Sequence, residues 1–186
     1  SVVLNVMAPV DAGEDGALTV CANDAPIDLI DLIGGSPMAG GSWSGPAGPT
    51  DGTFAPGTSA SGSYTYTVLG TQPCPNDAAV VVMTTSPLPN AGAAGSISLC
   101  PEADPVDLFG LLGGNPEPGG GWTGPNGQPA DALFVPGTDA AGVYTYTVNG
   151  IAPCPNATAS ATVTVYVVPA ANAGPDQVVC DLDAVL

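Results

Sequence analysis

Carboxylates are the side chains in this sequence that could carry out acid–base or metal chemistry. The 186 residues include 17 Asp and Glu and no Lys, Arg or His, so the formal net charge is -17. Two carboxylates in one cleft are the machinery of a glycosidase. Most of these acids, however, stand in turns and at the starts of helical stretches, where Asp is favoured by its hydrogen bonds to the backbone. We therefore predict that the protein is not an enzyme.

The lack of basic residues excludes several other classes of function. Nucleic-acid binding and attachment to anionic lipid headgroups both depend on Lys and Arg. Without His or Lys, the chain has no imidazole base, no histidine zinc ligand and no amine for a Schiff base. The sequence contains no run of 18 apolar residues. We expect no cofactor, no nucleic-acid partner and no membrane insertion.

Five cysteines could form disulfides or bind metal. They are Cys21, Cys74, Cys100, Cys154 and Cys180, and none belongs to a C-x-x-C pair. A metal cluster would need closer spacing or histidine ligands. In a chain with few charges and many turns, disulfides formed in an oxidising compartment are the better interpretation.

An internal repeat of about 80 residues sets the organisation of the chain. Trp43 and Trp122 are 79 positions apart, and the stretch 54–78 matches 134–158 almost without gaps. We expect the chain to be a window on a longer array. The predicted segments are the last strand of a preceding repeat at 1–13, one repeat at 14–91, a second at 92–173, and the first strand of a following repeat at 174–186.

Three acidic residues at the first junction are the best candidates for a cation site. Asp11, Glu14 and Asp15 stand close together in sequence and could bind calcium, which takes oxygen ligands. The corresponding stretch at 90–95, Asn-Ala-Gly-Ala-Ala-Gly, lacks these acids. Because a site needed in every joint should be copied in every joint, we favour solvated turns over a calcium site.

Each repeat has the pattern of short strands separated by turns. An opening strand at 17–23 is followed by apolar residues at helical spacing in 24–35, with Asp24, or Asp104 in the second repeat, able to cap this helical turn. The clearest strand, 63–70, alternates Tyr and Thr. With six or seven such segments per repeat, we predict an all-β fold of two small antiparallel β-sandwiches, each with one short helical turn.

The order of landmarks in each repeat resembles a known family. The landmarks are a Cys, LIDLIGG or LFGLLGG, G-G-x-W-x-G-P, F-x-P-G-T, G-x-Y-T-Y-T-V-x-G and P-C-P. In this order they resemble the immunoglobulin-like repeats of very large bacterial surface proteins exported by the type IX secretion system. The resemblance covers the whole chain. It implies tandem immunoglobulin-like sandwiches of adhesins, filaments or stalks at the cell surface.

Two disulfide pairings remain open from sequence. Pairing within repeats would give Cys21–Cys74 and Cys100–Cys154, which close loops of similar length, with Cys180 bonded to a cysteine further along. Pairing between repeats would give Cys74–Cys100 and Cys154–Cys180 and would stiffen the joint. We favour pairing within repeats, where a loop of about 50 residues contributes about 4 kcal/mol in the chain-entropy model.

The aromatic rings could form either a sugar-binding surface or part of the core. Trp43 and Trp122 each follow the opening cysteine of their repeat by 22 residues. This fixed spacing favours a core Trp packed near the disulfide. Tyr64 and Tyr144 fit a tyrosine corner, in which the hydroxyl donates to the backbone upstream. We assign all four to the structural core and keep carbohydrate binding through the rings as the alternative.

The sequence as a whole predicts a structural role outside the cell. We expect the repeat region of an extracellular or cell-surface adhesin or filament, acting as a stiff, disulfide-clamped stalk or fibre with semi-rigid Pro-bearing junctions. Its expected partners are neighbouring repeats, further copies in fibres, and host or surface glycans. The alternatives are a carbohydrate-binding adhesion module and a calcium-stiffened adhesin repeat.

Overall fold

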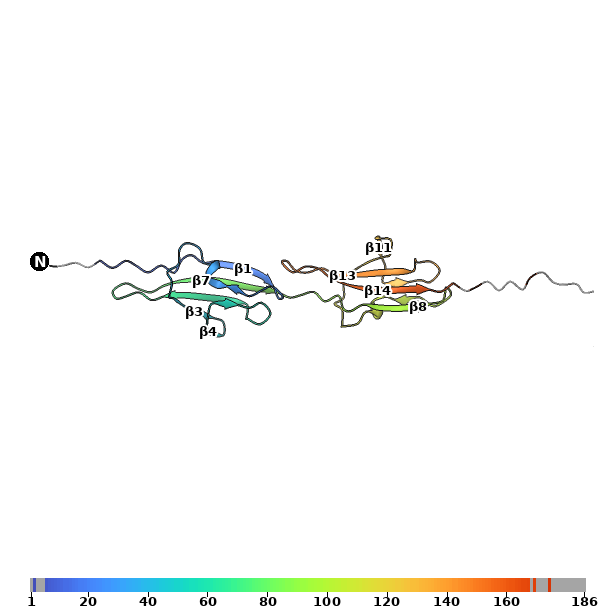
Figure 1. Cartoon of the computed structure of the whole chain (residues 1–186), viewed down its shortest axis with the longest axis horizontal. Helices are drawn as coiled ribbons and strands as arrows, with labels where there is room; N and C mark the ends of the chain where they lie inside the picture. The colour runs from blue at the N-terminus through green and yellow to red at the C-terminus, as the bar shows by residue number, and fades with distance from the viewer. Residues whose placement is uncertain (1, 3–5, 168, 170–173, 175–186) are drawn as a thin grey trace, which may run out of the picture.

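Two β-sandwich units lie end to end along the long axis of the molecule (Figure 1). The computed structural model of the protein describes residues 2, 6–167, 169 and 174. The strand expected at 174–186, with Cys180, lies outside the described residues apart from Gly174. The described part of 1–13 contains no strand, and the four predicted segment boundaries stay predictions.

The first unit is built on a five-stranded sheet with the strand order β1-β7-β6-β3-β4. Its strands are β1 (Gly16–Cys21), β3 (Ser42–Gly45), β4 (Gly48–Thr50), β6 (Gly62–Val68) and β7 (Asp77–Ser86). A second, two-stranded sheet pairs β2 (Ile27–Asp28) with β5 (Thr53–Phe54).

The second unit repeats this arrangement with the order β8-β14-β13-β10-β11. Its strands are β8 (Gly95–Leu99), β10 (Gly121–Thr123), β11 (Pro129–Ala130), β13 (Gly142–Val148) and β14 (Ala157–Val165). The two-stranded sheet here pairs β9 (Val106–Asp107) with β12 (Leu133–Phe134). The repeat in the sequence is therefore a repeat in topology, and the predicted all-β fold is confirmed.

One strand pair in each unit is parallel within otherwise antiparallel sheets. β1 runs parallel to β7, and β8 runs parallel to β14. A parallel pair needs a long connection rather than a hairpin, and here the connection is the rest of the unit. Because β1 and β7 run in the same direction, both end where the first unit faces the second (Figure 1). Cys21 lies opposite Ser86 at that end.

The predicted helical turn is present in each unit as a short 3-10 helix. The turns are η1 (Leu29–Leu32) and η2 (Phe109–Leu111). Asp24 and Asp104 were the expected caps, but Asp28 and Asp107 instead accept hydrogen bonds from the N–H two residues ahead, at 3.3 and 3.0 Å. The expected caps lie too early because β2 and β9 come before the turns. No helix among the described residues is long and apolar enough to cross a membrane.

Each unit has its own hydrophobic core, and the two cores do not merge. Alternate residues of β6, including Tyr64 and Tyr66, face the first core, while the residues between them are partly exposed. Strand β13 has the same burial pattern in the second unit. Phe54 and Phe134, from the small sheets, are 0% and 1% exposed. The joint between the units is therefore a separate feature and not an extension of either core.

Candidate functional site

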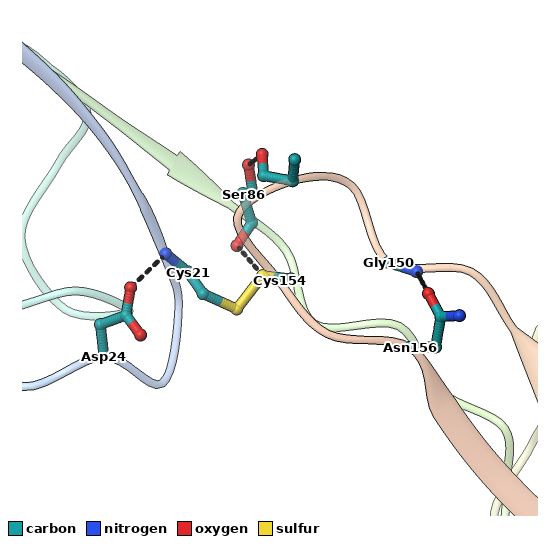
Figure 2. Close-up of a disulfide and its surroundings, with 7 residues drawn as sticks. Cys21, Asp24, Ser86, Gly150, Cys154 and Asn156 are labelled. Atoms are coloured by element: carbon teal, nitrogen blue, oxygen red, sulfur yellow. Dashed lines mark hydrogen bonds between the residues drawn. A yellow bond between two sulfur atoms is a disulfide. The ribbon is translucent and has the colours of Figure 1, made fainter.

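A disulfide joins the two units (Figure 2). Cys21, at the end of β1, is bonded to Cys154 in the loop between β13 and β14, with the two Cα atoms 4.9 Å apart. Cys74 and Cys100 are free. The favoured pairing within repeats is therefore wrong, and the Cys74–Cys100 bond of the other pairing is also absent. The structure has a third arrangement, in which the opening-strand cysteine of one unit bonds the loop cysteine of the next.

The topology explains why a unit does not close its own two cysteines. Cys21 lies beside Ser86, the last residue of β7, whereas Cys74 precedes Asp77, the first residue of β7. The ten residues of β7 span roughly 30 Å. A disulfide requires Cα atoms within about 7 Å, and Cys21 and Cys74 lie at opposite ends of the sandwich. The sequence did not reveal this because strand register is not encoded in cysteine spacing.

The disulfide is enclosed by groups from both units. Cys21 and Cys154 are 1% and 6% exposed. The Cys21 N–H donates to Asp24 Oδ2 at 2.7 Å, which holds the turn after β1. The Ser86 carbonyl oxygen lies 3.3 Å from Cys154 Sγ, and the Ser86 hydroxyl donates to the Ala152 carbonyl at 3.1 Å (Figure 2). Ser86 of the first unit is thus anchored to the loop of the second.

The loop that carries Cys154 is held in shape by its own hydrogen bonds. We call residues 69–76 and 149–156 the cysteine loops of the two units. Asn156 Oδ1 accepts from the Gly150 N–H at 3.0 Å (Figure 2), and the Cys154 N–H donates to the Ile151 carbonyl at 2.9 Å. A Cβ at Gly150 would collide with backbone carbonyl oxygens of the loop. The loop therefore presents Cys154 on a preformed support.

The linker between the units is also docked onto the second unit. The Asn90 side chain accepts from the Gly92 N–H at 2.9 Å and donates to the carbonyls of Gly114 and Asn115 at 3.0 Å. The Asn90 carbonyl accepts from the Glu117 N–H at 2.8 Å. A hollow of about 90 Å³ is lined by Pro87, Leu88, Pro89, Glu117, Asn149 and Ile151. Linker and disulfide form two separate connections across the joint.

The two tryptophans pack on tyrosine rings. The Trp43 and Tyr66 ring centroids are 5.1 Å apart, and those of Trp122 and Tyr146 are 5.0 Å apart. Trp122 is 8% exposed, and Trp43 is partly buried at the edge of its core. Tyr66 pairs with Ala79 near the start of β7, while Cys21 lies at the other end of that strand. The expected position of Trp beside a disulfide is therefore wrong for the first unit.

Tyr64 and Tyr144 make the hydrogen bonds that a tyrosine corner predicts. Each hydroxyl donates at 2.8 Å to the carbonyl four residues upstream, that of Ala60 or Ala140. Burial raises the pKa of both phenols, and the nearby Asp139 carboxylate further raises the pKa of Tyr144. Both tyrosines are 5% exposed and pack edge-on against the core Phe of their unit.

Besides packing on the tryptophans, Tyr66 and Tyr146 hold the turn before the Trp strand through their hydroxyls, a role that the sequence analysis missed. The Tyr146 hydroxyl donates to the Glu117 carbonyl at 2.7 Å and accepts from the Gly120 N–H at 2.8 Å. Tyr66 makes the same two bonds, at 2.7 and 2.9 Å, to the turn before β3. The Gly-Gly that precedes each Trp was a usable signal, because a Cβ at Gly120 would collide with the Tyr146 ring.

Of the three acidic residues predicted as weak calcium ligands, two have side chains that accept separate backbone hydrogen bonds, and the third forms a bridge through its main chain. Asp11 Oδ1 accepts from the Gly13 N–H at 2.8 Å, and Asp15 Oδ1 accepts from the Val80 N–H at 2.7 Å. Glu14 forms an isolated β-bridge with Gly34. No group of three His, Cys, Asp or Glu side chains suited to a metal occurs in the described part of the chain. Elsewhere, the Thr53 N–H lowers the pKa of Asp51.

Comparison with known proteins identifies the fold. No protein-family model matches the chain, and no curated protein matches it. The insect immune protein hemolin aligns with a TM-score of 0.51 and 14% identity, over 86% of this chain and 46% of hemolin. The titin I-band fragment I67–I69 aligns with a TM-score of 0.49 and 12% identity, over 82% of this chain and 63% of the fragment. The chain spans less than two thirds of each of these structures.

The likeness to hemolin shows that the units are immunoglobulin-like β-sandwiches. This confirms the fold that the sequence resemblance implied. At 14% identity the comparison establishes the fold alone.

Proposed function

We propose that the chain is a structural repeat region of an extracellular or cell-surface adhesin or filament, built as a stiff stalk or fibre. The observation that supports this most directly is the Cys21–Cys154 bond, which joins two units rather than closing one. A peptide linker alone is a single connection about which two units can still bend and twist, whereas a linker and a disulfide together restrain both motions. The docked Pro-bearing linker adds to the same restraint.

The disulfide also determines how tension passes through the chain. When the chain is pulled from its two ends, force runs along β1 to Cys21, crosses the disulfide to Cys154 and leaves through β14. Residues 22–153 lie outside this path and cannot lengthen the molecule while the bond is intact. A repeat protein of this kind holds its length under load, which suits a stalk that presents an adhesive domain.

The negative charge of the chain affects whether neighbouring chains can associate into fibres. The formal charge of -17 makes neighbouring chains repel one another at low ionic strength. Self-association into fibres would therefore strengthen as salt screens the repulsion. The hemolin structure is described in terms of homophilic adhesion, and contact between like chains is the corresponding proposal here.

Glycan binding through the aromatic rings has less support. A ring that stacks on a sugar needs an exposed face, and Trp122 is 8% exposed. A surface hollow of about 660 Å³ on the second unit is lined by Asp131, Asp139 and Tyr144 among others, and neither Trp contributes to it. Calcium stiffening likewise lacks a cluster of ligands among the described residues. We keep the stalk as the proposed function.

Single-molecule force spectroscopy tests the proposed mechanism. A chain with Cys74, Cys100 and Cys180 all replaced by Ser is pulled from its termini, with and without a reductant. Reduction should increase the final contour length by about 450 Å, because residues 22–153 then extend at about 3.5 Å each. A contour length that is the same in both conditions would contradict the proposal.

A further inference from the structure

The two free cysteines occupy the same positions in the repeat as the two bonded ones. Cys100 follows Leu99, which is the last residue of β8, just as Cys21 ends β1. Cys74 and Cys154 stand at matching places in the cysteine loops, three residues before the first residue of β7 or β14. Each unit therefore carries one cysteine of the opening-strand type and one of the loop type.

The cysteine loop of the first unit has the conformation of the bonded loop. In both loops the final Asn side chain accepts from the opening Gly N–H at 3.0 Å. In both, the N–H of Cys74 or Cys154 donates three residues back at 2.9 Å. The Cys74 thiol lies 3.9 Å from the Met7 carbonyl oxygen. In the second unit, Cys154 Sγ lies 3.3 Å from the carbonyl oxygen of Ser86. The loop that carries Cys74 thus has the same internal hydrogen bonds as the loop that carries the bonded Cys154.

The chain before the first unit is docked as the linker before the second unit is docked. Asp11 Oδ1 accepts from the Gly13 N–H, as Asn90 Oδ1 does from Gly92. The Asp11 carbonyl accepts from the N–H of Met38 at 2.8 Å, as the Asn90 carbonyl does from Glu117. Two independent parts of the joint, the loop and the linker, are therefore preformed on the first unit. A unit placed before it would meet the surface that the second unit presents to the first.

We propose that Cys74 and Cys100 each form an inter-unit disulfide of the Cys21–Cys154 type, at two further and different joints. Cys74 bonds the opening-strand cysteine of a like unit on its N-terminal side, and Cys100 bonds the loop cysteine of a like unit on its C-terminal side. This inference rests on the proposed function as a repeat array. The partner in each case is an immunoglobulin-like unit of this same type, supplied by the array or by a second copy of the chain.

The geometry prevents Cys74 and Cys100 from bonding each other within one chain. The cysteine loop of the first unit projects away from the second unit, at the left end in Figure 1. Strand β8 runs parallel to β14 and ends at the far side of the second unit. Cys100 is exposed there, whereas the equivalent Cys21 is covered by the next unit. The two thiols therefore face outward from opposite ends of the molecule.

The proposed bonds would form a staggered ladder along an array. Each bond spans from one opening strand to the loop of the next unit, as Cys21–Cys154 does over 133 positions. Because the repeat is about 80 residues, successive spans overlap and every residue of the array falls inside at least one of them. An array closed in this way would have no unit able to extend fully under load.

Each bond forms by an ordinary thiol–disulfide exchange. With glutathione disulfide as the oxidant, one loop-type thiol, such as Cys74, and one opening-strand thiol of a neighbouring unit, such as Cys100 of a second copy, together lose two protons and two electrons to form one protein disulfide. The glutathione disulfide accepts them and becomes two molecules of reduced glutathione.

The test uses two full-length variants that differ in the remaining free thiol. In the first, Cys74→Ser and Cys180→Ser leave Cys100, and in the second, Cys100→Ser and Cys180→Ser leave Cys74. Each variant alone and their equimolar mixture are incubated in a glutathione redox buffer at about millimolar chain, the effective concentration a short linker provides. Non-reducing electrophoresis and mass spectrometry of chymotryptic peptides then identify the bonds, including an intact Cys21–Cys154.

The mixture should give a Cys74–Cys100 dimer in at least about tenfold excess over both homodimers together. Each variant alone should stay largely monomeric. Random pairing would make the mixed dimer only as abundant as the two homodimers together, and that result, or an absence of dimers, would overturn the inference. Neither outcome bears on the force measurement, which uses a chain without Cys74 and Cys100, so the two proposals fail separately.

Discussion

The cysteine loops of the two units have the same internal hydrogen bonds, yet Cys154 is in a disulfide and Cys74 is not. The conformation of the loop is therefore set by its Asn–Gly hydrogen bond and not by the disulfide. What differs is the neighbour, because the end of β1 lies against the second loop only. The comparison teaches that the disulfide is a property of the joint between units, while the cysteine loop keeps the same internal hydrogen bonds with or without it.

The largest effect expected from this comparison is the loss of the inter-unit bond. Cys21→Ser should lower the combined stability of the two units by about 5 kcal/mol in the chain-entropy model, because the bond closes a loop of roughly 130 residues. Cys74→Ser, at the equivalent loop position in the first unit, removes a thiol with no bond within the chain. It should change stability little. Calorimetry of both variants measures the difference, and equal losses would contradict the assignment of the bond to the joint.

The next largest effect is expected in the separate cores. Phe54→Ala and Phe134→Ala each remove a fully buried ring and should cost about 3 to 5 kcal/mol. Because the cores do not merge, each variant should destabilise its own unit and leave the other unchanged. Amide hydrogen exchange in β6 and β13 reports the two units separately. A matching loss of protection in both strands would show that the units are energetically coupled through the joint.

The sequence was sufficient for the fold because its signals are local. The alternation of Tyr64 and Tyr66 with Thr, the Gly-Gly after the helical turn, and the 80-residue period each follow from backbone periodicity or turn chemistry. These predicted the strands, a short helical turn in each repeat and the duplication. The tyrosine corner was predicted for the same reason, since Tyr144 bonds a carbonyl four residues away.

The joint could not be predicted because it depends on long-range register. The parallel pairing of β1 with β7 places Cys21 opposite Ser86, and neither spacing nor composition encodes that pairing. Both predicted connectivities treated cysteines that are close in sequence as close in space. The predicted helical cap, Asp24, lies four residues before the observed one, Asp28, because the short strand β2 (Ile27–Asp28) comes between Asp24 and the turn.

A moderate effect is expected from removing the Tyr146 hydroxyl. Tyr146→Phe breaks two hydrogen bonds in the partly buried turn before β10, one to the Glu117 carbonyl and one from the Gly120 N–H, a loss of about 2 kcal/mol. Tyr144→Phe in the same strand breaks one bond and should cost about 1 kcal/mol. Chemical denaturation of the two variants gives the ranking, and a reversed order would contradict the role assigned to Tyr146.

Alkaline pH should weaken both units through their tyrosine corners. The pKa values of Tyr64 and Tyr144 are raised above the ordinary value of 10.0 in the folded protein. A group with a raised folded pKa contributes its full stability below the unfolded pKa, and loses it as pH rises through the folded value. Stability should therefore fall above pH 10, as followed by denaturation at increasing pH. The double variant Tyr64→Phe, Tyr144→Phe should show a shallower decline over the same range.

The smallest expected effect is a gain in stability at a position where the units differ. The Thr85 hydroxyl is buried without a hydrogen-bond partner among the described residues. Thr85 lies opposite Val20, and the equivalent position opposite Leu99 is Val165. Thr85→Val keeps the shape of the side chain and removes an unsatisfied polar group, so the first unit should gain about 1 kcal/mol. The converse variant, Val165→Thr, should lose a similar amount in the second unit. If Thr85→Val instead destabilised the first unit, the hydroxyl would have to be hydrogen-bonded in solution, and this position would no longer distinguish the two units.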